Sequence, residues 1–265
     1  MANWHVGHPF PFSAHRRETP TNHKQVTNRP HTTMKHSFLA IILSLCLSNA
    51  TAQEHLRSIS ILGDSYSTYK NYVEPDTNAL WYPQERPSSN DVQAVEQTWW
   101  HLLLSDYGLR LCRNNSFSGS TISTTGYNKE DYTSRAFITR MHNLGSPDMI
   151  LIFGATNDSW AGSPIGDYKY EGWTKEDLKQ FRPAMAYMLS YMTRRYVNVK
   201  ICFILNSELK DSINESVRAI CSHYGVDLIE LHDIDKQSGH PSIQGMQSIA
   251  QQVAEHLGLN TEGKQ

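Results

Sequence analysis

Four residues, widely spaced along the chain, have the types needed for acyl transfer by a serine nucleophile. Ser65 follows the apolar run at residues 59–62, and Gly119, Asn157 and His240 come after it in that order. A serine hydroxyl becomes nucleophilic when a base removes its proton, and fixed N–H donors stabilise the oxyanion that forms. The sequence therefore contains a candidate nucleophile in Ser65, a candidate base in His240 and two candidate oxyanion donors.

Each of these residues also has an ordinary structural interpretation. Ser65 suits a helix N-cap, Gly119 and Asn157 suit turns, and a single histidine is usually a polar surface or core residue. Position favours the catalytic interpretation, because Ser65, Gly119 and Asn157 each follow a predicted strand. His240 differs from the other histidines of the chain in that glycine and proline flank it and a predicted helix follows.

The elements that must position these residues alternate between strand and helix. Apolar runs predict five strands, at residues 57–62, 109–113, 147–153, 199–205 and 226–231. Helical spacing predicts helices at residues 96–107, 174–196, 211–224 and 242–257. Pro183 is expected to kink the second of these helices or to start a new one. The pattern predicts an α/β fold with a parallel sheet and helices on both faces, with the functional residues at the carboxyl ends of the strands.

The four blocks, beginning with Gly63-Asp64-Ser65-Tyr66, resemble those of the SGNH (GDSL-type) serine hydrolases. The resemblance covers residues 57–257. It implies a three-layer α/β/α sandwich with a five-stranded parallel, flavodoxin-like sheet, and ester hydrolysis through an acyl-enzyme without metal or cofactor. It also implies that the N–H groups of Ser65 and Gly119 and the side chain of Asn157 bind the oxyanion, with His240 as the base.

Two positions depart from the family pattern. The family usually has Asp three residues before the histidine, where this chain has Gln237, and Gly two residues before the asparagine, where it has Ala155. Three ways of orienting His240 therefore stay open: a carboxylate from Asp235, with Asp233 behind it; the amide oxygen of Gln237; or a backbone carbonyl in a Ser–His dyad. We favour the amide or the dyad, because a shift of two residues would point a carboxylate elsewhere.

Two long connections, at residues 66–94 and 159–173, leave strand ends that should carry catalytic groups. We predict that they wall a substrate cleft and that their aromatic side chains stack on sugar rings, with packing of the loops onto the protein as the alternative for each side chain: Trp81, Tyr82, Trp160, Tyr170 and Trp173. This favours an esterase that removes acetyl or other short acyl groups from carbohydrate. The alternatives are a lipase-like esterase or lysophospholipase, and a catalytically impaired glycan-binding protein on the same fold.

The N-terminal segment has the pattern of an export signal. Basic Lys35 precedes an apolar stretch at residues 38–48, which a small-residue site at residues 50–52 follows. We predict a signal peptide at residues 34–52, an upstream extension that is non-native or disordered at residues 1–33, and a single hydrolase domain at residues 53–265. The expected location is secreted or periplasmic, in a bacterium.

Composition narrows the range of partners. The chain has 265 residues, a formal net charge of −2 and 39% hydrophobic residues, as expected of a globular protein. No basic run indicates nucleic acid, and no cysteine pattern indicates zinc. We predict a small-molecule or glycan ester as substrate, no metal or cofactor, no nucleic acid and no stable membrane anchor. The sequence leaves the oligomeric state open.

Overall fold

The computed structural model describes residues 58–85 and 88–259. The chain divides into two units, Met1–Gln53 and Glu54–Gln265, and the described residues all belong to the second. The predicted upstream extension and signal peptide lie outside the described residues, so both stay predictions. Among the described residues, no helix is both long and apolar enough to cross a membrane.

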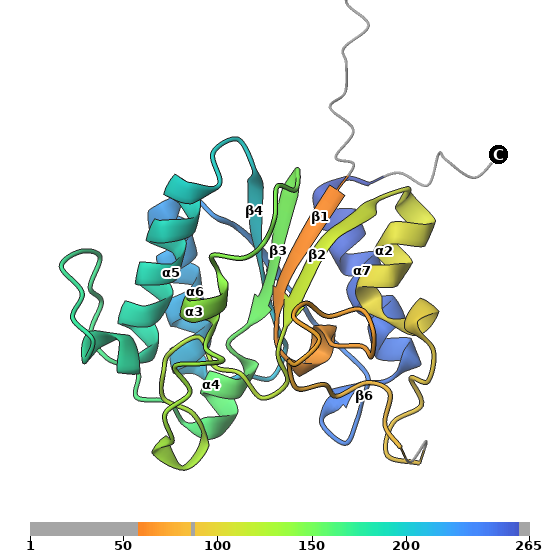
Figure 1. Ribbon diagram of the computed structural model, residues 1–265, viewed down its shortest axis with the longest axis horizontal. Coiled ribbons are helices and arrows are strands. Elements are labelled where there is room, and N and C mark those ends of the chain that lie inside the picture. Colours follow the sequence, from red (N-terminus) through yellow and green to blue (C-terminus); the bar gives the residue numbers. More distant parts are fainter. Residues whose placement is uncertain (1–57, 86–87, 260–265) are drawn as a thin grey trace, which may run out of the picture. The chain divides into compact units, whose positions relative to one another are not determined.

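A parallel sheet of five strands forms the centre of this unit (Figure 1). Its strands are β1 (Ser58–Gly63), β2 (Arg110–Ser116), β3 (Met149–Gly154), β4 (Lys200–Leu205) and β5 (Asp227–Glu230). They lie in the order β2-β1-β3-β4-β5, and every neighbouring pair is parallel. This is the flavodoxin-like order, so the predicted fold class is confirmed.

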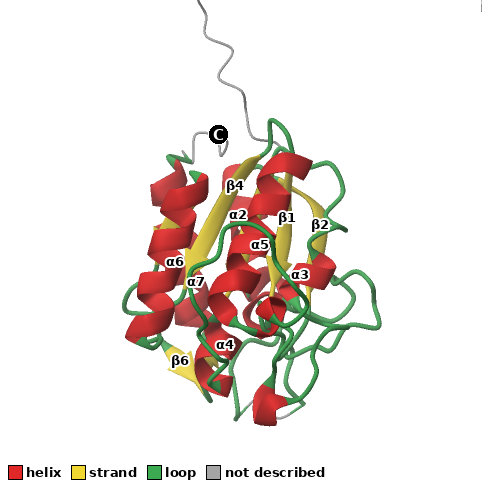
Figure 2. Cartoon of the chain, turned by 90° about the vertical axis from the view of Figure 1, so that its left-hand side faces the viewer, coloured by secondary structure: helices red, strands yellow, loops and turns green. Residues whose placement is uncertain are grey.

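Helices cover both faces of the sheet. One face packs against α2 (Trp99–Tyr107) and α7 (Ile243–Leu257), and the other against α3 (Phe137–Arg140), α5 (Phe181–Arg195) and α6 (Asp211–Tyr224). Figure 2 views the unit from the side of α5 and α6, which stand in front of the strands. Side chains of β3 alternate between the two cores, with Ile150 and Ile152 in one and Leu151 and Phe153 in the other. That alternation follows from the two-residue period of a strand.

The predicted helix at residues 174–196 is wrong as a single element. A 3-10 helix, η4 (Asp177–Lys179), is followed by Gln180 in an extended conformation, and only then does α5 begin. Pro183 lies in the first turn of α5, where a missing N–H costs nothing because no intrahelical partner exists there. The alternative that the proline starts a second helix is therefore correct.

Five short elements were not predicted. They are η1 (Ser65–Ser67), η2 (Val95–Gln97), η3 (Tyr127–Lys129), α3 and α4 (Thr156–Ala161), and a small hairpin of β6 (Lys236–Gln237) and β7 (His240–Pro241) accompanies them. Each is too short for hydrophobic periodicity to reveal. Two of the five and the hairpin nevertheless carry candidate functional residues, because η1 begins at Ser65, α4 includes Asn157 and β7 begins at His240.

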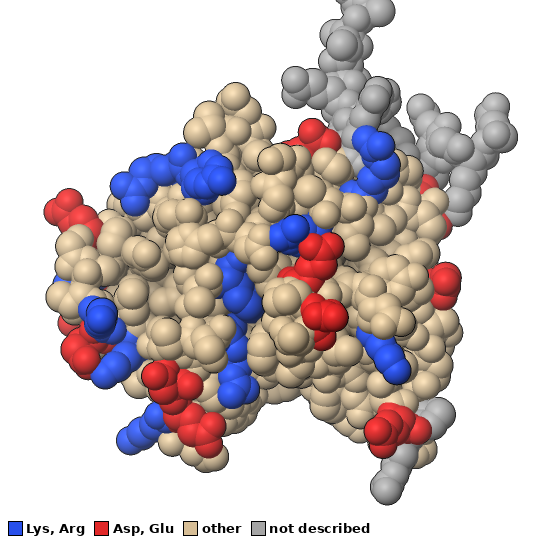
Figure 3. All heavy atoms as spheres, in the orientation of Figure 1, with Lys and Arg blue, Asp and Glu red and all other residues tan. Residues whose placement is uncertain are grey.

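Strand order brings the candidate residues to one edge of the sheet. β1 lies between β2 and β3, and Gly63 at its end pairs with Ser116 of β2 and Phe153 of β3. The chain crosses from one side of β1 to the other here, and such a switch point is where open α/β sheets bind ligands. On the face shown in Figure 3, basic and acidic side chains of the described residues are interspersed.

Candidate active site

The structure places Ser65 and His240 in direct contact. Nε2 of His240 lies 2.9 Å from Oγ of Ser65, although the two residues are 175 positions apart. Both side chains are largely buried, with 3% and 6% of their surface exposed. A hydroxyl and an imidazole at hydrogen-bond distance form a nucleophile and base pair.

A backbone carbonyl holds the other nitrogen of the imidazole. Nδ1 of His240 lies 3.1 Å from the carbonyl oxygen of Ser238. Ser238 and Gly239 form the two-residue turn of the β6–β7 hairpin, with φ values of 52° and 76°. Two positive φ values are the mark of a tight hairpin turn. Since a carbonyl only accepts, Nδ1 carries the proton and Nε2 presents its lone pair to Ser65.

The carboxylate and amide alternatives for orienting His240 are both wrong. Asp235 accepts a hydrogen bond from the hydroxyl of Ser242, at the N-cap of α7, and Asp233 pairs with His232. The amide of Gln237 pairs with Asp91, accepting from its N–H at 2.9 Å and donating to its Oδ2 at 3.2 Å. The side chains of Asp235, Asp233 and Gln237 thus have hydrogen-bond partners at the start of α7, on the surface and in the long loop, and not at His240. The dyad alternative matches the observed geometry.

Asn157 is held at both ends of its amide. The hydroxyl of Tyr127 donates to Oδ1 at 2.9 Å, and Nδ2 donates to Oδ2 of Asp64 at 3.4 Å. Because a phenol that donates must face an oxygen, the Tyr127 contact fixes which way the amide points. Nδ2 has two N–H groups, so one remains for a substrate oxygen.

Two backbone N–H groups complete the donor set. Those of Ser65 and Gly119 have no hydrogen-bond partner among the described residues. Gly119 has a φ of 76° and is the third residue of a turn closed by the bond from Ser120 N–H to Phe117 O at 3.2 Å. Apart from Gly119 and its two chain neighbours, no described residue has an atom within 4 Å of where a side chain at Gly119 would begin, so this face of the turn is open.

The backbone conformation of Ala155 explains why the family usually has glycine two residues before the asparagine. It lies between β3 and α4 with a φ of 72°, in the left-handed region. That conformation costs a residue with a side chain about 1–2 kcal/mol relative to the right-handed one. The strain lies in the turn that delivers Asn157, in keeping with the tendency of strained backbone to occur at functional sites.

Burial shapes the electrostatics around the pair. It lowers the pKa of His240 to about 4, and the bond to Ser238 offsets only part of that effect. It raises the pKa of Asp64 to about 7, against the opposing bond from Tyr66 N–H. It also raises the pKa of Asp158 to about 6, although Ile122 and Ser123 donate to that carboxylate. His240 is therefore a neutral base at neutral pH.

The long connection after Ser65 braces the hairpin that carries His240. The indole of Trp81 stacks on the imidazole, with ring centroids 3.5 Å apart and planes 6° apart. The hydroxyl of Tyr82 and the amide of Asn90 donate to the carbonyl of Pro241 at 2.9 Å and 3.1 Å. In Figure 1 this loop, coloured orange to yellow, lies beside the blue β6 hairpin. The loop thus positions the base.

Of the five predicted aromatic contacts, three do not fit a sugar-binding role. Tyr82 is 1% exposed and lies in the core. Tyr170 stacks on His223 at 3.7 Å, and Trp173 packs edge-on against Tyr187 at 5.5 Å. These partners belong to α6 and α5, and neither Tyr170 nor Trp173 has a ring contact with His240 among the described residues, so the contacts seen do not support the prediction that these two residues line the cleft.

Trp160 does lie at the site. Its ring is 5.9 Å from that of His240 and 6.3 Å from that of Tyr66, yet 43% of its surface is exposed. Trp81 is also at the site, but one of its faces is occupied by His240. Trp160 is therefore the predicted aromatic residue with a surface free for a ligand.

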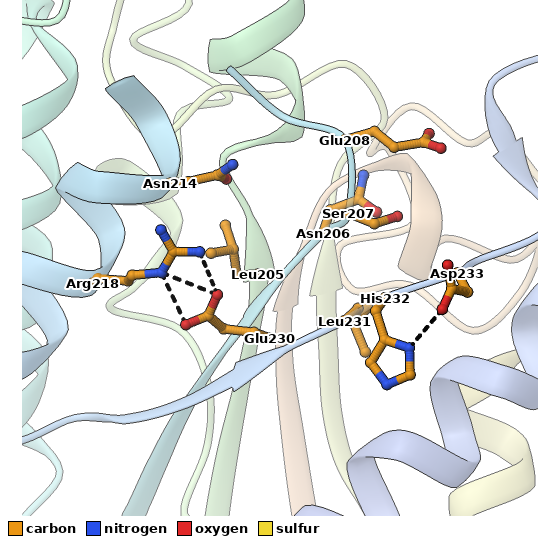
Figure 4. Close-up of a pocket in the computed structure, with 10 residues that line it drawn as sticks. All are labelled: Leu205, Asn206, Ser207, Glu208, Asn214, Arg218, Glu230, Leu231, His232 and Asp233. Carbon is orange, nitrogen blue, oxygen red and sulfur yellow. Dashed lines mark hydrogen bonds and ion pairs between the residues drawn. The ribbon is translucent and has the colours of Figure 1, made fainter. Parts of the chain in front are cut away.

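A polar pocket of about 310 Å³ opens at the ends of β4 and β5 (Figure 4). Arg218 and Glu230 form a bidentate ion pair in it, and His232 contacts Asp233. Asn206 connects the pocket with the catalytic cluster, because its amide donates to the hydroxyl of Tyr66 at 3.4 Å. Among the described residues, no group of three or more His, Cys, Asp or Glu side chains could hold a metal ion.

Sequence reasoning missed four residues of this site: Tyr66, Asp91, Tyr127 and Ser238. Tyr66 donates to the carbonyl of Gly239 at 2.6 Å and so supports the turn before His240. The sequence carries no local signal for Asp91 or Tyr127, because both act through partners far away in the chain. Ser238-Gly239 did carry one, since a two-residue loop ending in glycine is typical of a tight hairpin.

Comparisons with known proteins show the family of the chain. The model of the GDSL-like Lipase/Acylhydrolase family matches residues 57–257. A protein named a GDSL-like lipase from Bacteroides ovatus is 62% identical, with a TM-score of 0.75, over 77% of this chain and 99% of that chain. Another so named, from Bacteroides uniformis, is 55% identical, with a TM-score of 0.75, over 76% and 95%.

A more distant likeness concerns the fold alone. A family two carbohydrate esterase from Clostridium thermocellum, solved in complex with cellohexaose, is 16% identical, with a TM-score of 0.51, over 77% of this chain and 65% of that chain. No curated protein matches the chain.

Proposed function

Because the chain belongs to the GDSL-like lipase/acylhydrolase family, we propose that it is a serine esterase that removes acetyl or other short acyl groups from carbohydrate. The observation that carries the proposal is the 2.9 Å contact between Nε2 of His240 and Oγ of Ser65. The export pattern at residues 34–52 adds that the enzyme works outside the cytoplasm, on material that reaches the periplasm or the exterior.

Acylation begins with attack by Oγ of Ser65 on the ester carbonyl carbon. His240 takes the hydroxyl proton on Nε2, and the carbonyl oxygen becomes an oxyanion. The N–H groups of Ser65 and Gly119 and the free N–H of Asn157 donate to that oxyanion. The carbon–oxygen bond to the alcohol then breaks, and the alcohol leaves with the proton from Nε2 of His240.

Deacylation repeats the steps with water. His240 removes a proton from a water molecule, whose oxygen attacks the acyl carbon on Ser65. The second oxyanion collapses, the bond to Oγ of Ser65 breaks, and Oγ recovers the proton from Nε2. The carbonyl of Ser238 holds Nδ1–H throughout, so the imidazole keeps one tautomer in its neutral form.

Two features support carbohydrate as the alcohol part of the ester. Trp160 presents an exposed aromatic surface beside His240. The polar pocket of Figure 4 lies at the same edge of the sheet, and the side-chain oxygens of Asn206 and Asn214, two of its lining residues, are buried without a hydrogen-bond partner among the described residues. Hydroxyl groups could donate to such acceptors.

Acyl-chain preference tests the substrate. With p-nitrophenyl esters and purified residues 53–265, we expect acetyl esters to give a kcat/KM at least about tenfold above octanoyl esters. Acetylated xylose or cellobiose should also be deacetylated, as measured by acetate release. A preference for octanoyl or longer esters would instead indicate a lipase-like esterase or lysophospholipase. Glycan binding without any hydrolysis would indicate the impaired binding protein.

The pH profile tests the state of His240. The base must be neutral, and burial lowers its pKa to about 4. We therefore expect kcat/KM for an acetyl ester to stay on a plateau from pH 7 down to about pH 5 and to fall with an apparent pKa of about 4. An acid limb near 6.5, the usual pKa of histidine, would contradict this account of the site. If kcat/KM instead falls with an apparent pKa near 7, and this fall is absent in Asp64→Asn, then protonation of Asp64 causes it.

Stability at low pH must be measured in the same buffers. Below pH 6.5 the unfolded chain binds the His240 proton before the folded chain does, so this residue's contribution to folding stability falls as the pH drops towards 4. Asp64 and Asp158 act in the opposite sense, because their raised pKa values favour the folded state as pH falls from 7. Circular dichroism at each pH distinguishes loss of activity through protonation of His240 from loss of activity through unfolding.

A further inference from the structure

His240 has neither a carboxylate partner nor any charged side chain within hydrogen-bond reach among the described residues. Its Nδ1–H meets the carbonyl of Ser238, a neutral group. Two acidic side chains on segments packed around it bond to other groups, Asp91 to Gln237 and Ile243 N–H, and Asp64 to Tyr66 N–H and Asn157. The imidazolium formed during the reaction therefore lacks the counter-charge that a triad supplies.

The face of an aromatic ring lies against the imidazole, where it can stabilise the positive charge. The indole of Trp81 lies parallel to the imidazole, with centroids 3.5 Å apart. Tyr66 contacts the ring at a tilt, with centroids 5.2 Å apart, and Tyr82 and Trp160 contact it edge-on at 6.4 Å and 5.9 Å. The face of an aromatic ring attracts a cation, most strongly for tryptophan and when water is excluded. Trp81 alone presents its face in full.

The backbone of Trp81 is tied to the turn of the nucleophile. Its N–H donates to Oγ1 of Thr68 at 2.9 Å, and that hydroxyl donates to the carbonyl of Ser65 at 3.0 Å. Thr68 is fully buried. One hydroxyl therefore ties the backbone of Trp81 to that of Ser65, and the indole of Trp81 stacks on the ring of His240.

We propose that Trp81 is a positioning residue that substitutes for the missing acid, by holding the plane of His240 and stabilising its protonated form through the face of the indole. The inference rests on the proposed function, since it concerns the base of that reaction. The positive charge exists in the transition states but not in the resting enzyme, so the interaction lowers the barriers to acylation and deacylation.

Trp81→Phe and Trp81→Leu test this with acetyl ester as substrate. A desolvated cation–π contact of this kind corresponds to on the order of 10- to 30-fold in rate. We expect kcat to fall in the order Trp, Phe, Leu, by about that factor for Leu, with KM changed less than twofold. We also expect the acid limb of kcat/KM in Trp81→Leu to move to lower pH, because leucine keeps the site apolar but does not attract the cation.

Other outcomes overturn the proposal. A raised KM with an unchanged kcat would make Trp81 a substrate-binding residue, as the sequence first suggested. An acid limb that moves up towards 6.5 would mean that Trp81 only excludes water from His240. Equal kcat values for Phe and Leu would show that filling the space is enough.

Controls separate this result from failure of the proposed function. Tyr69→Phe removes a hydrogen bond within the same loop, from the Tyr69 hydroxyl to the carbonyl of Gln93 at 2.7 Å, while leaving the indole in place, so its acid limb should stay near that of the wild type. Trp81→Phe gives a readout if Trp81→Leu does not fold, as judged by circular dichroism. Wild-type protein that hydrolyses no ester would refute the proposed function, whereas active wild type with unaffected Trp81 variants would refute this inference alone.

Discussion

Replacing Ser65 with alanine is expected to lower kcat for acetyl esters by about 10⁴- to 10⁶-fold, the range found when the nucleophile of a serine hydrolase is removed. The hydroxyl of Ser65 is the only group of the protein that bonds to the acyl carbon of the substrate in the proposed mechanism. The measurement is initial-rate hydrolysis of p-nitrophenyl acetate with the background rate subtracted.

Ser67→Ala is the matched control for this experiment. Ser67 lies in the same short helix, η1, and is as deeply buried, but its hydroxyl has no hydrogen-bond partner among the described residues. Its removal should leave kcat within a few-fold of the wild type. Comparable losses in the two variants would mean that the turn, and not the hydroxyl of Ser65, had been damaged.

The second large effect is expected at Asn157. Asn157→Ala removes one of three proposed oxyanion donors and should lower kcat by about 10²- to 10³-fold, with little change in KM, because the oxyanion exists only after attack. Tyr127→Phe should lower kcat by a smaller factor, about tenfold, since the amide keeps its N–H groups but loses the bond that fixes their direction. Steady-state kinetics with an acetyl ester gives both values.

Tyr132→Phe is the control for Tyr127. The two rings lie 6.5 Å apart, but the hydroxyl of Tyr132 has no bond to Asn157. It should therefore leave kcat nearly unchanged. If Asn157→Ala affected KM alone, Asn157 would be a substrate-binding residue, and the oxyanion site would need other donors.

The sheet and its long helices could be predicted because each is long enough to show its period. The apolar run at residues 149–153 predicts a strand buried on both faces, and β3 is one. The helix at Asp211–Tyr224 was predicted with its correct bounds, since its apolar stripe is regular and Gly225 ends it in the left-handed conformation. Strand order then followed from the resemblance to a flavodoxin-like family.

The surroundings of His240 could not be predicted, because they depend on contacts between distant segments. Gln237 occupies the position of the expected acid, but its amide oxygen accepts a hydrogen bond from the N–H of Asp91, 146 residues earlier. Trp81 was predicted to stack on a sugar ring and instead lies against the imidazole of His240. Sequence spacing gives only the distance between residues along the chain. The contacts of Gln237 with Asp91 and of Trp81 with His240 depend on how a long loop folds back onto the hairpin.

Two aromatic residues that were predicted to line the cleft have their partners elsewhere, for a related reason. The segment at residues 159–173 leaves the edge of the sheet that carries Asn157, which favoured a role at the site for all its aromatic residues. Within this segment Trp160 lies beside His240, whereas Tyr170 packs against His223 and Trp173 packs against Tyr187. A loop of this length can leave the site within a few residues, so only its first residues are fixed by the strand that precedes it.

The central claim, that Ser65 is a nucleophile activated by His240, is tested most directly by covalent labelling. A fluorophosphonate reacts with an activated serine hydroxyl, and mass spectrometry of the digested protein identifies the labelled residue. We predict one adduct per chain, on Ser65, that forms at neutral pH and is lost in His240→Ala while Ser67→Ala still reacts. An unlabelled Ser65 in folded wild-type protein, or labelling that persists in His240→Ala at the wild-type rate, would contradict the account.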